Sequence, residues 1–214
     1  MTKMIFVRHG QSEANLAHVF AGHTNTPLTE HGKQQAERTA QFLRDYPIDK
    51  IYASDLTRAM QTAEPTARLF GLEIIPDSAL REIYAGAWEN LPYETLMRDF
   101  SESYSVWRTD CGLAHPEQGE SVLALSERIY AEVDRIAKEN EGRCVAIFSH
   151  ATPIRLLRAR WEGYSPRELA KVTFSGNASV SVVDYLDDGT YRIHLCGYDG
   201  HQGDAATGLA KGIV

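Results

Sequence analysis

The chain has 214 residues, of which 43% are hydrophobic, and a formal net charge of -7. This length suits one well-cored domain, with at most a small inserted subdomain. The acidic balance argues against broad nucleic-acid binding, because proteins that bind phosphate backbones normally carry a basic surplus. No apolar run approaches membrane-spanning length, and the three cysteines show no paired spacing. We therefore expect a cytoplasmic protein with reduced thiols that binds neither nucleic acid nor membranes.

The first predicted strand is the apolar run from Met4 to Val7, which leads directly into Arg8, His9 and Gly10. An open α/β sheet binds ligands beyond the carboxyl ends of its strands, so Arg8 and His9 stand where such folds do their chemistry. Taken alone, this tripeptide fits an ordinary surface Arg-His pair equally well.

A polar loop follows over residues 11–27. Thr29 is a good N-cap, and small or apolar residues then recur at helical spacing, which predicts an amphipathic helix to about Tyr46. Residues 50–54 are expected to form a short strand.

The second predicted helix begins after Ser54 or Asp55, either of which can cap it, and carries Arg58 in its first turn. A cation there opposes the helix dipole, which hints at a nearby anion; the alternative is a solvated arginine. Pro65 should kink or break this helix because proline removes a backbone donor.

Residues 72–76 resemble another strand, and the irregular stretch 84–119 is interpreted as a partly helical insertion and a candidate lid. The strongest helical stripe of the chain follows from Val122 to Ile136, with Ser121 as its cap and Gly142 as its stop.

A second apolar run, residues 144–148, ends in Ser149 and His150, and a helix is expected from Pro153 onward. If the two strands are parallel neighbours, His9 and His150 meet with Arg8 between them. Such a site offers cationic and donor groups without a thiol or carboxylate nucleophile, which suits a phosphate monoester.

Alternation over residues 178–185 and 191–195, around a turn at Asp187 to Gly189, predicts a terminal antiparallel hairpin. The tail 198–214 lacks a period and is expected to be mobile or docked on a neighbour. The predicted fold class is α/β: a three-layer α/β/α sandwich whose mainly parallel sheet carries one antiparallel strand.

Five separated segments, in this order, resemble the histidine phosphatase superfamily, in its phosphoglycerate mutase-like branch 1. They are residues 8–15, 27–32, 54–62, 80–82 and 149–150. The resemblance runs from Met4 to about Tyr185 and implies the phosphoglycerate mutase-like fold. Residues 1–214 would then be a single histidine phosphatase domain.

The resemblance implies five catalytic residues. His9 would be the nucleophile that forms a phosphohistidine, while Arg8, Arg58 and a cationic His150 would bind the phosphoryl oxygens. Glu82 would protonate the leaving oxygen and later take a proton from water. Without the resemblance, Glu82 beside Arg81 would be interpreted as an exposed ion pair.

Further phosphate or substrate contacts are expected from Asn15, Gly22, His23 and the backbone amide of Ala151, where the family often has glycine. A carbonyl near Gly10 should fix the tautomer of His9. The other histidines lack the spacing of a metal-binding helix, so we expect no metal and no cofactor.

The leading hypothesis is a histidine acid phosphatase-type hydrolase, a phosphomonoesterase acting on a small phosphorylated metabolite. The short interval between Glu82 and His150 favours it over the first alternative, a 2,3-bisphosphoglycerate-dependent phosphoglycerate mutase. The second alternative is a catalytically silent module that binds a phospho-ligand. Sugar phosphates, phosphoglycerates and a cobalamin-precursor phosphate all stay open as substrates, and the oligomeric state is open, with a dimer as one option.

Overall fold

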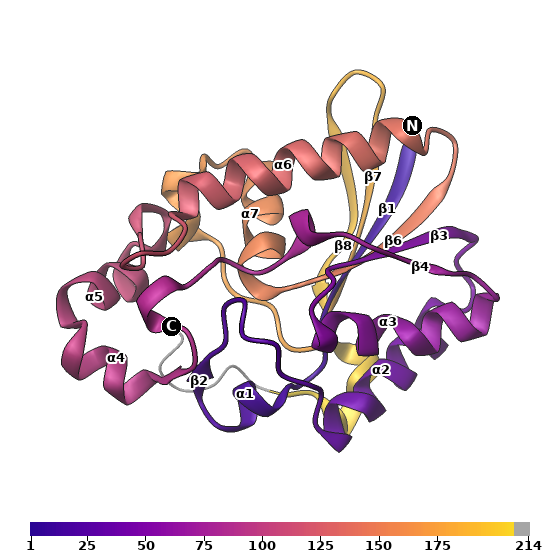
Figure 1. Cartoon of the computed structure of the whole chain (residues 1–214). Coiled ribbons are helices and arrows are strands. Elements are labelled where there is room, and N and C mark those ends of the chain that lie inside the picture. Colours follow the sequence, from indigo (N-terminus) through magenta and orange to yellow (C-terminus); the bar gives the residue numbers. More distant parts are fainter. Residues whose placement is uncertain (208–214) are drawn as a thin grey trace.

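The computed structural model, which describes residues 1–207, has a central sheet of six strands in the order β4-β3-β6-β1-β7-β8 (Figure 1). Four strands are parallel neighbours: β4 (Ile74–Pro76), β3 (Ile48–Ala53), β6 (Cys144–Ser149) and β1 (Thr2–Arg8). β7 (Val180–Tyr185) runs antiparallel both to β1 and to the edge strand β8 (Tyr191–Tyr198). The predicted mainly parallel sheet with one antiparallel strand is confirmed.

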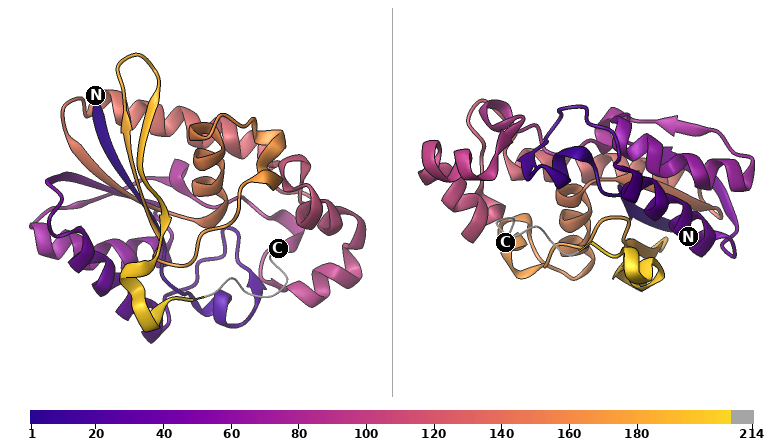
Figure 2. Two further views of the ribbon diagram at one scale, coloured as in Figure 1. Left: turned by 180° about the vertical axis from the view of Figure 1, so that it is seen from behind. Right: turned by 90° about the horizontal axis from the view of Figure 1, so that it is seen from below.

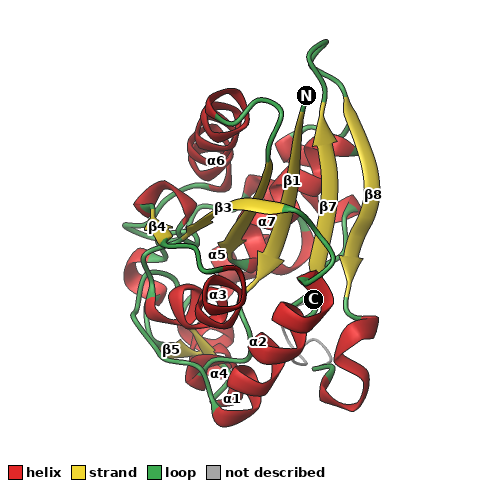
Figure 3. Ribbon diagram, turned by 90° about the vertical axis from the view of Figure 1, so that its right-hand side faces the viewer, coloured by secondary structure: helices red, strands yellow, loops and turns green. Residues whose placement is uncertain are grey.

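Helices cover both faces of this sheet (Figure 3). α2 (Glu30–Leu43) and α3 (Thr57–Phe70) pack on one face, and α6 (Val122–Glu139) and α7 (Ala151–Trp161) on the other. Side chains alternate along β1. Ile5 and Val7 therefore pack in the core between the sheet and α2 and α3, while Met4 and Phe6 pack in the core between the sheet and α6 and α7. Because both faces are covered, the central strands β1 and β6 are buried along almost their whole length, and the predicted three-layer sandwich is confirmed.

The predicted insertion, residues 84–119, contains α4 (Tyr93–Asp99) and α5 (Ser101–Thr109), which project beside the sheet (Figures 1 and 2). Short elements join it to the rest: α1 (Glu13–Leu16), and a two-stranded sheet of β2 (Val19–Phe20) and β5 (Leu91–Pro92). The 3₁₀ helices are η1 (Ser78–Leu80), η2 (Gly86–Trp88), η3 (Cys111–Leu113), η4 (Pro166–Lys171) and η5 (Gly200–Ala205).

Two expectations about α3 were wrong. The helix is not broken at Pro65, although a proline inside a helix costs about 3 kcal/mol. Ala59, Ala63 and Ala67 are buried along its inner face, and this packing outweighs the lost hydrogen bond. Its N-cap is Leu56, without a side-chain cap, because the side chains of Ser54 and Asp55 bind elsewhere.

The C-terminal segment up to Thr207 is docked on α2. The backbone oxygen of Ala205 accepts hydrogen bonds from the side chains of His31, at 3.0 Å, and Gln35, at 2.7 Å. The rest of the predicted tail, residues 208–214, lies outside the described residues. Within residues 1–207, none of the helices is long and apolar enough to cross a membrane.

Candidate active site

Strand register brings the two histidines together. Arg8 at the end of β1 is paired with Ser149 at the end of the parallel strand β6, so His9 and His150 follow side by side. Their ring centroids lie 5.2 Å apart. The sheet therefore places both side chains at the carboxyl edge, where open α/β folds bind ligands.

The imidazole of His9 is buried and has one defined tautomer. Its Nδ1 lies 2.7 Å from the carbonyl oxygen of Gly10, in agreement with the sequence-based prediction. A carbonyl only accepts hydrogen bonds, so Nδ1 carries the proton and Nε2 keeps a lone pair. Burial, then the charges of Arg58 and Arg8, hold the pKa of His9 well below its ordinary value. His9 is therefore a neutral imidazole with a nucleophilic nitrogen at neutral pH.

Two buried arginines, Arg8 and Arg58, line the same cavity as His9. Arg58 donates to the carbonyl oxygens of Thr24 at 2.9 Å and Gly22 at 2.8 Å, and Arg8 donates to that of Ser175. The Nε of Arg8 has no hydrogen-bond partner among residues 1–207. Burial lowers the pKa of Arg58 to about 10, so its guanidinium stays cationic at neutral pH.

The backbone conformation and close packing at Gly22 require a glycine. It has a φ of +48°, and a Cβ there would lie 2.1 Å from the carboxylate oxygen of Glu89. Only glycine lets this carbonyl reach Arg58.

The charge of His150 differs from the sequence-based prediction. Its Nε2 lies 2.8 Å from the hydroxyl of Ser54, and its buried Nδ1 has no partner within the described part of the chain. Burial, followed by the charges of Arg58 and His9, holds the pKa of His150 well below the ordinary value. The expectation of a cationic His150 was wrong for this structure, because a buried site that already holds Arg8 and Arg58 disfavours a third positive charge.

The Glu82 carboxylate accepts hydrogen bonds from the backbone amides of Ile83 at 2.9 Å and Thr152 at 3.3 Å. Arg81 is paired with Asp55 instead. The alternative of a simple Glu82–Arg81 ion pair is therefore wrong.

Arg128 of α6 holds the loop that carries Glu82. It donates to the backbone oxygens of Ala79, Arg81 and Glu82, at 2.9 to 3.2 Å, and is paired with Glu120 at 2.7 Å. Sequence reasoning missed this residue, because nothing in a helical stripe marks one arginine as the anchor of a distant loop.

Most of the predicted site residues line one cavity: Arg8, His9, Asn15, Gly22, Arg58, Glu82 and Ala151. His150 is fully buried beside His9 and is not part of the cavity wall. His23 also lies outside the wall, where its Nε2 is 2.9 Å from the backbone oxygen of Glu82. Its contact is therefore with the Glu82 loop.

The amide group of Asn15 is oriented by a residue that the sequence analysis missed. Its Oδ1 accepts from the Ser12 backbone amide and from Nδ2 of Asn177, both at 3.1 Å. Since the oxygen is occupied, the Nδ2 group of Asn15 is left to donate into the cavity. Asn177 also donates to the backbone oxygen of His9 at 3.1 Å and so ties Asn15 to the turn that carries His9.

The lowered pKa values of His9 and His150 predict a loss of stability in acid. In the unfolded chain both groups titrate near pH 6.5, so below that pH the unfolded chain binds more protons and the free energy of unfolding falls. His150→Gln should make this fall shallower by up to about 1.4 kcal/mol per pH unit. Urea unfolding at a series of pH values measures the slope, and the exposed His115→Gln should leave it unchanged. Equal slopes in the parent and His150→Gln would contradict the prediction.

A neutral, buried histidine and two buried arginines, at the carboxyl edge of a three-layer α/β sandwich, form an arrangement that suits the binding of a phosphate group. Comparison with known proteins agrees: the model of the histidine phosphatase superfamily (branch 1) matches residues 4–197. The chain belongs to this family.

Its relatives include phosphatases with different substrates. The chain is 36% identical over 160 residues to the adenosylcobalamin/alpha-ribazole phosphatase of Salmonella typhimurium, covering 74% of this chain and 78% of the relative. It is 31% identical over 185 residues to phosphoserine phosphatase 1 of Hydrogenobacter thermophilus, covering 86% of each. The solved structure of Bacillus stearothermophilus YhfR superposes with a TM-score of 0.89 at 27% identity, covering 94% of this chain and 99% of that one.

Proposed function

We propose that the protein is a phosphatase of the histidine acid phosphatase type, which hydrolyses a small phosphorylated metabolite through a phosphohistidine on His9. The observation that carries the proposal is the free Nε2 of a neutral, buried His9 beside two buried arginines. The phosphatase names of two relatives support it.

In the first step, Nε2 of His9 attacks phosphorus in line, and the bond from phosphorus to the ester oxygen breaks. Arg8 and Arg58 stabilise the phosphoryl oxygens, and the carboxyl of Glu82 gives its proton to the leaving oxygen. The buried, unpartnered Nδ1 of His150, which lies beside His9 behind the cavity wall, is proposed to donate to the same oxygens once the phosphoryl group is bound. In the second step, water attacks the phosphohistidine and Glu82 takes up a proton, which releases inorganic phosphate and restores His9.

We propose that this chemistry needs no metal. The guanidinium groups of Arg8 and Arg58 supply the positive charge that a metal gives in other phosphoryl-transfer sites.

The two alternatives are separated from the proposal by one set of assays. The purified protein is incubated with p-nitrophenyl phosphate and, separately, with 3-phosphoglycerate with and without 2,3-bisphosphoglycerate. We expect release of inorganic phosphate from p-nitrophenyl phosphate. Isomerisation that depends on the bisphosphate would favour a mutase, and phosphate binding without any turnover would favour a silent binding module.

A further inference from the structure

Two chemically different sets of side chains line the cavity. Arg8, His9 and Arg58 form the part that is proposed to receive the phosphoryl group, here called the phosphate end. A second part of the wall is apolar and aromatic and consists of Val19, Phe20, Tyr93, Trp107 and Phe174. The part of a substrate that leaves with the ester oxygen must lie against this second part.

The aromatic wall is fixed by its own packing. Phe20 meets Trp107 edge to face, with centroids 5.2 Å apart at 71°, and meets Tyr93 in the same way at 6.3 Å and 86°. These contacts join β2 to α4 and α5 of the insertion. Aromatic rings held in this way give a preformed surface for a flat apolar group, without an entropic cost of ordering the wall.

Phe174 is also held in place. The guanidinium of Arg155 lies 4.2 Å from the centre of its ring, and the Nε of Arg155 donates to the backbone oxygen of Val172. Its Nη1 lies 3.0 Å from the Sγ of Cys111. These contacts engage the Arg155 guanidinium outside the cavity wall.

The aromatic wall carries no formal charge. Among residues 1–207, the cations that line the cavity are Arg8 and Arg58, both at the phosphate end, and the one carboxylate is Glu82. Burial raises the pKa of Tyr93 to about 12, so its phenol stays neutral.

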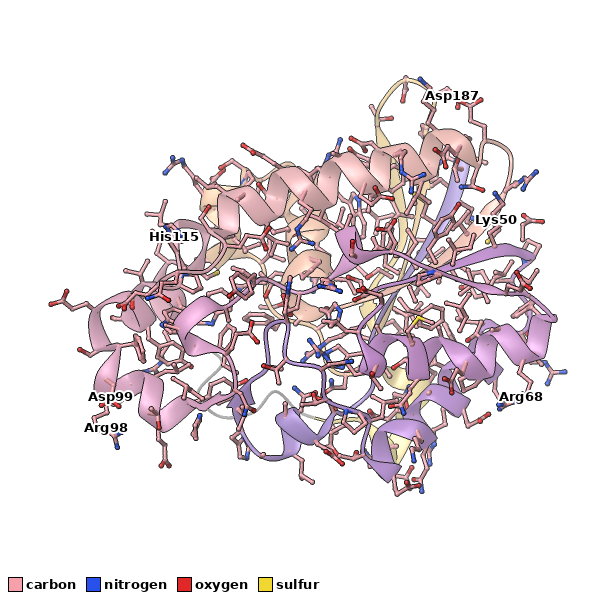
Figure 4. The ribbon with its side chains drawn as sticks, viewed as in Figure 1. Lys50, Arg68, Arg98, Asp99, His115 and Asp187 are labelled. Carbon is pink, nitrogen blue, oxygen red and sulfur yellow. The ribbon has the colours of Figure 1, made fainter. Side chains whose placement is uncertain are left out.

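The charges at the tip of α4 do not supply a further cation. Arg98 is paired with Asp99 at 2.7 Å, and Figure 4 shows both side chains at the outer end of that helix. A second phosphate or carboxylate on a substrate would therefore lose its hydration against aromatic rings without gaining a counter-charge.

From this geometry, and resting on the proposed function, we infer that the natural substrate is the phosphate monoester of an uncharged alcohol that carries an aromatic or other flat apolar ring. The aromatic wall takes up the ring, and substrates with a second anionic group, such as phosphoglycerates and bisphosphates, are disfavoured.

The test compares esters that all leave as primary alkoxides: 2-phenylethyl phosphate, n-propyl phosphate, O-phosphoserine and 3-phosphoglycerate. We expect kcat/KM for 2-phenylethyl phosphate to exceed that for 3-phosphoglycerate by about thirtyfold or more, mainly through KM, because the ring is buried and the carboxylate is not compensated. n-Propyl phosphate should fall between them. Inhibition constants for 2-phenylethylphosphonate and phosphonoacetate make the same comparison without turnover.

A matched pair of variants tests the cause. Val19 lines the apolar wall on β2 and is only partly buried, so a longer side chain is tolerated there. Val19→Lys adds a cation and should shift the ratio of the two kcat/KM values towards 3-phosphoglycerate by about tenfold. Val19→Gln, which has similar bulk and no charge, should leave the anionic ester disfavoured.

The outcomes separate this inference from the proposed function. Turnover of p-nitrophenyl phosphate with equal or better kcat/KM for 3-phosphoglycerate than for 2-phenylethyl phosphate overturns the inference and leaves the phosphatase intact. A Val19→Lys variant that turns over substrate with an unchanged ratio also overturns it. Absence of turnover on every ester removes the proposed function. In that case the inhibition constants of 2-phenylethylphosphonate and phosphonoacetate still show whether the aromatic wall prefers an aromatic ring to a carboxylate.

Discussion

His9→Ala is expected to lower kcat/KM by at least about 10⁴-fold on every phosphomonoester tested, because the variant loses the Nε2 that is proposed as the nucleophile. Binding of inorganic phosphate should persist in this variant, since Arg8, Arg58 and His150 remain. Steady-state kinetics measures the first effect, and the rise in unfolding temperature with added phosphate measures the second.

The control for this variant is His115→Ala. His115 is exposed, with its Nε2 3.2 Å from the backbone oxygen of Gly119, and lies far from the sheet edge (Figure 4). Its loss should leave kinetics unchanged. Rapid acid-free quench of the parent enzyme should reveal a phosphohistidine that His9→Ala lacks. Turnover by His9→Ala at the parent rate would remove the covalent mechanism.

Glu82→Gln should separate substrates by their leaving groups. Alkyl phosphates leave as strongly basic alkoxides that need a proton, so their kcat should fall by about a hundredfold or more, in the range of a positioned general acid. p-Nitrophenyl phosphate has a leaving group that departs unaided and should lose much less. Paired kinetics on 2-phenylethyl phosphate and p-nitrophenyl phosphate gives both numbers.

Glu94→Gln is the matched control. Glu94 is an exposed carboxylate in the first turn of α4 and lies outside the cavity wall, so its substitution removes the same charge without touching the cavity. It should affect neither substrate. Equal losses on both substrates in Glu82→Gln would move the acid role to another group. Since Glu82 is also proposed to assist water, the variant should accumulate phosphohistidine wherever the second step becomes limiting.

The sequence was most informative where local pattern and chemistry coincide. An apolar run that ends in Arg8 and His9, and another that ends in His150, predicted two buried strands with reactive tips, and the register of β1 and β6 brings those tips together. Caps were predictable for the same reason: Thr29 and Ser121 accept hydrogen bonds from amides three residues on, as their sequence context indicated.

Sequence reasoning failed where the outcome depends on distant neighbours. Pro65 lies inside an unbroken α3 because packing against the sheet outweighs a local penalty. Ser54 does not act as the N-cap of α3: its hydroxyl lies 2.8 Å from Nε2 of His150 and accepts only a longer bond, at 3.4 Å, from the amide of Leu56. The charge of His150 was misjudged because burial and the proximity of Arg58 have no local signature in the sequence.

The sequence by itself indicated the order of most strands and helices and the candidate side chains for nucleophile and phosphate binding, because periodicity and residue chemistry are local properties. The tertiary structure decided which tautomer His9 holds, how Arg128 and Asn177 position Glu82 and Asn15, and that uncharged aromatic side chains line the same cavity as Arg8 and Arg58. These features arise from contacts between residues that lie far apart in the chain, and the free energy of such contacts is set by burial and geometry that only the folded chain creates.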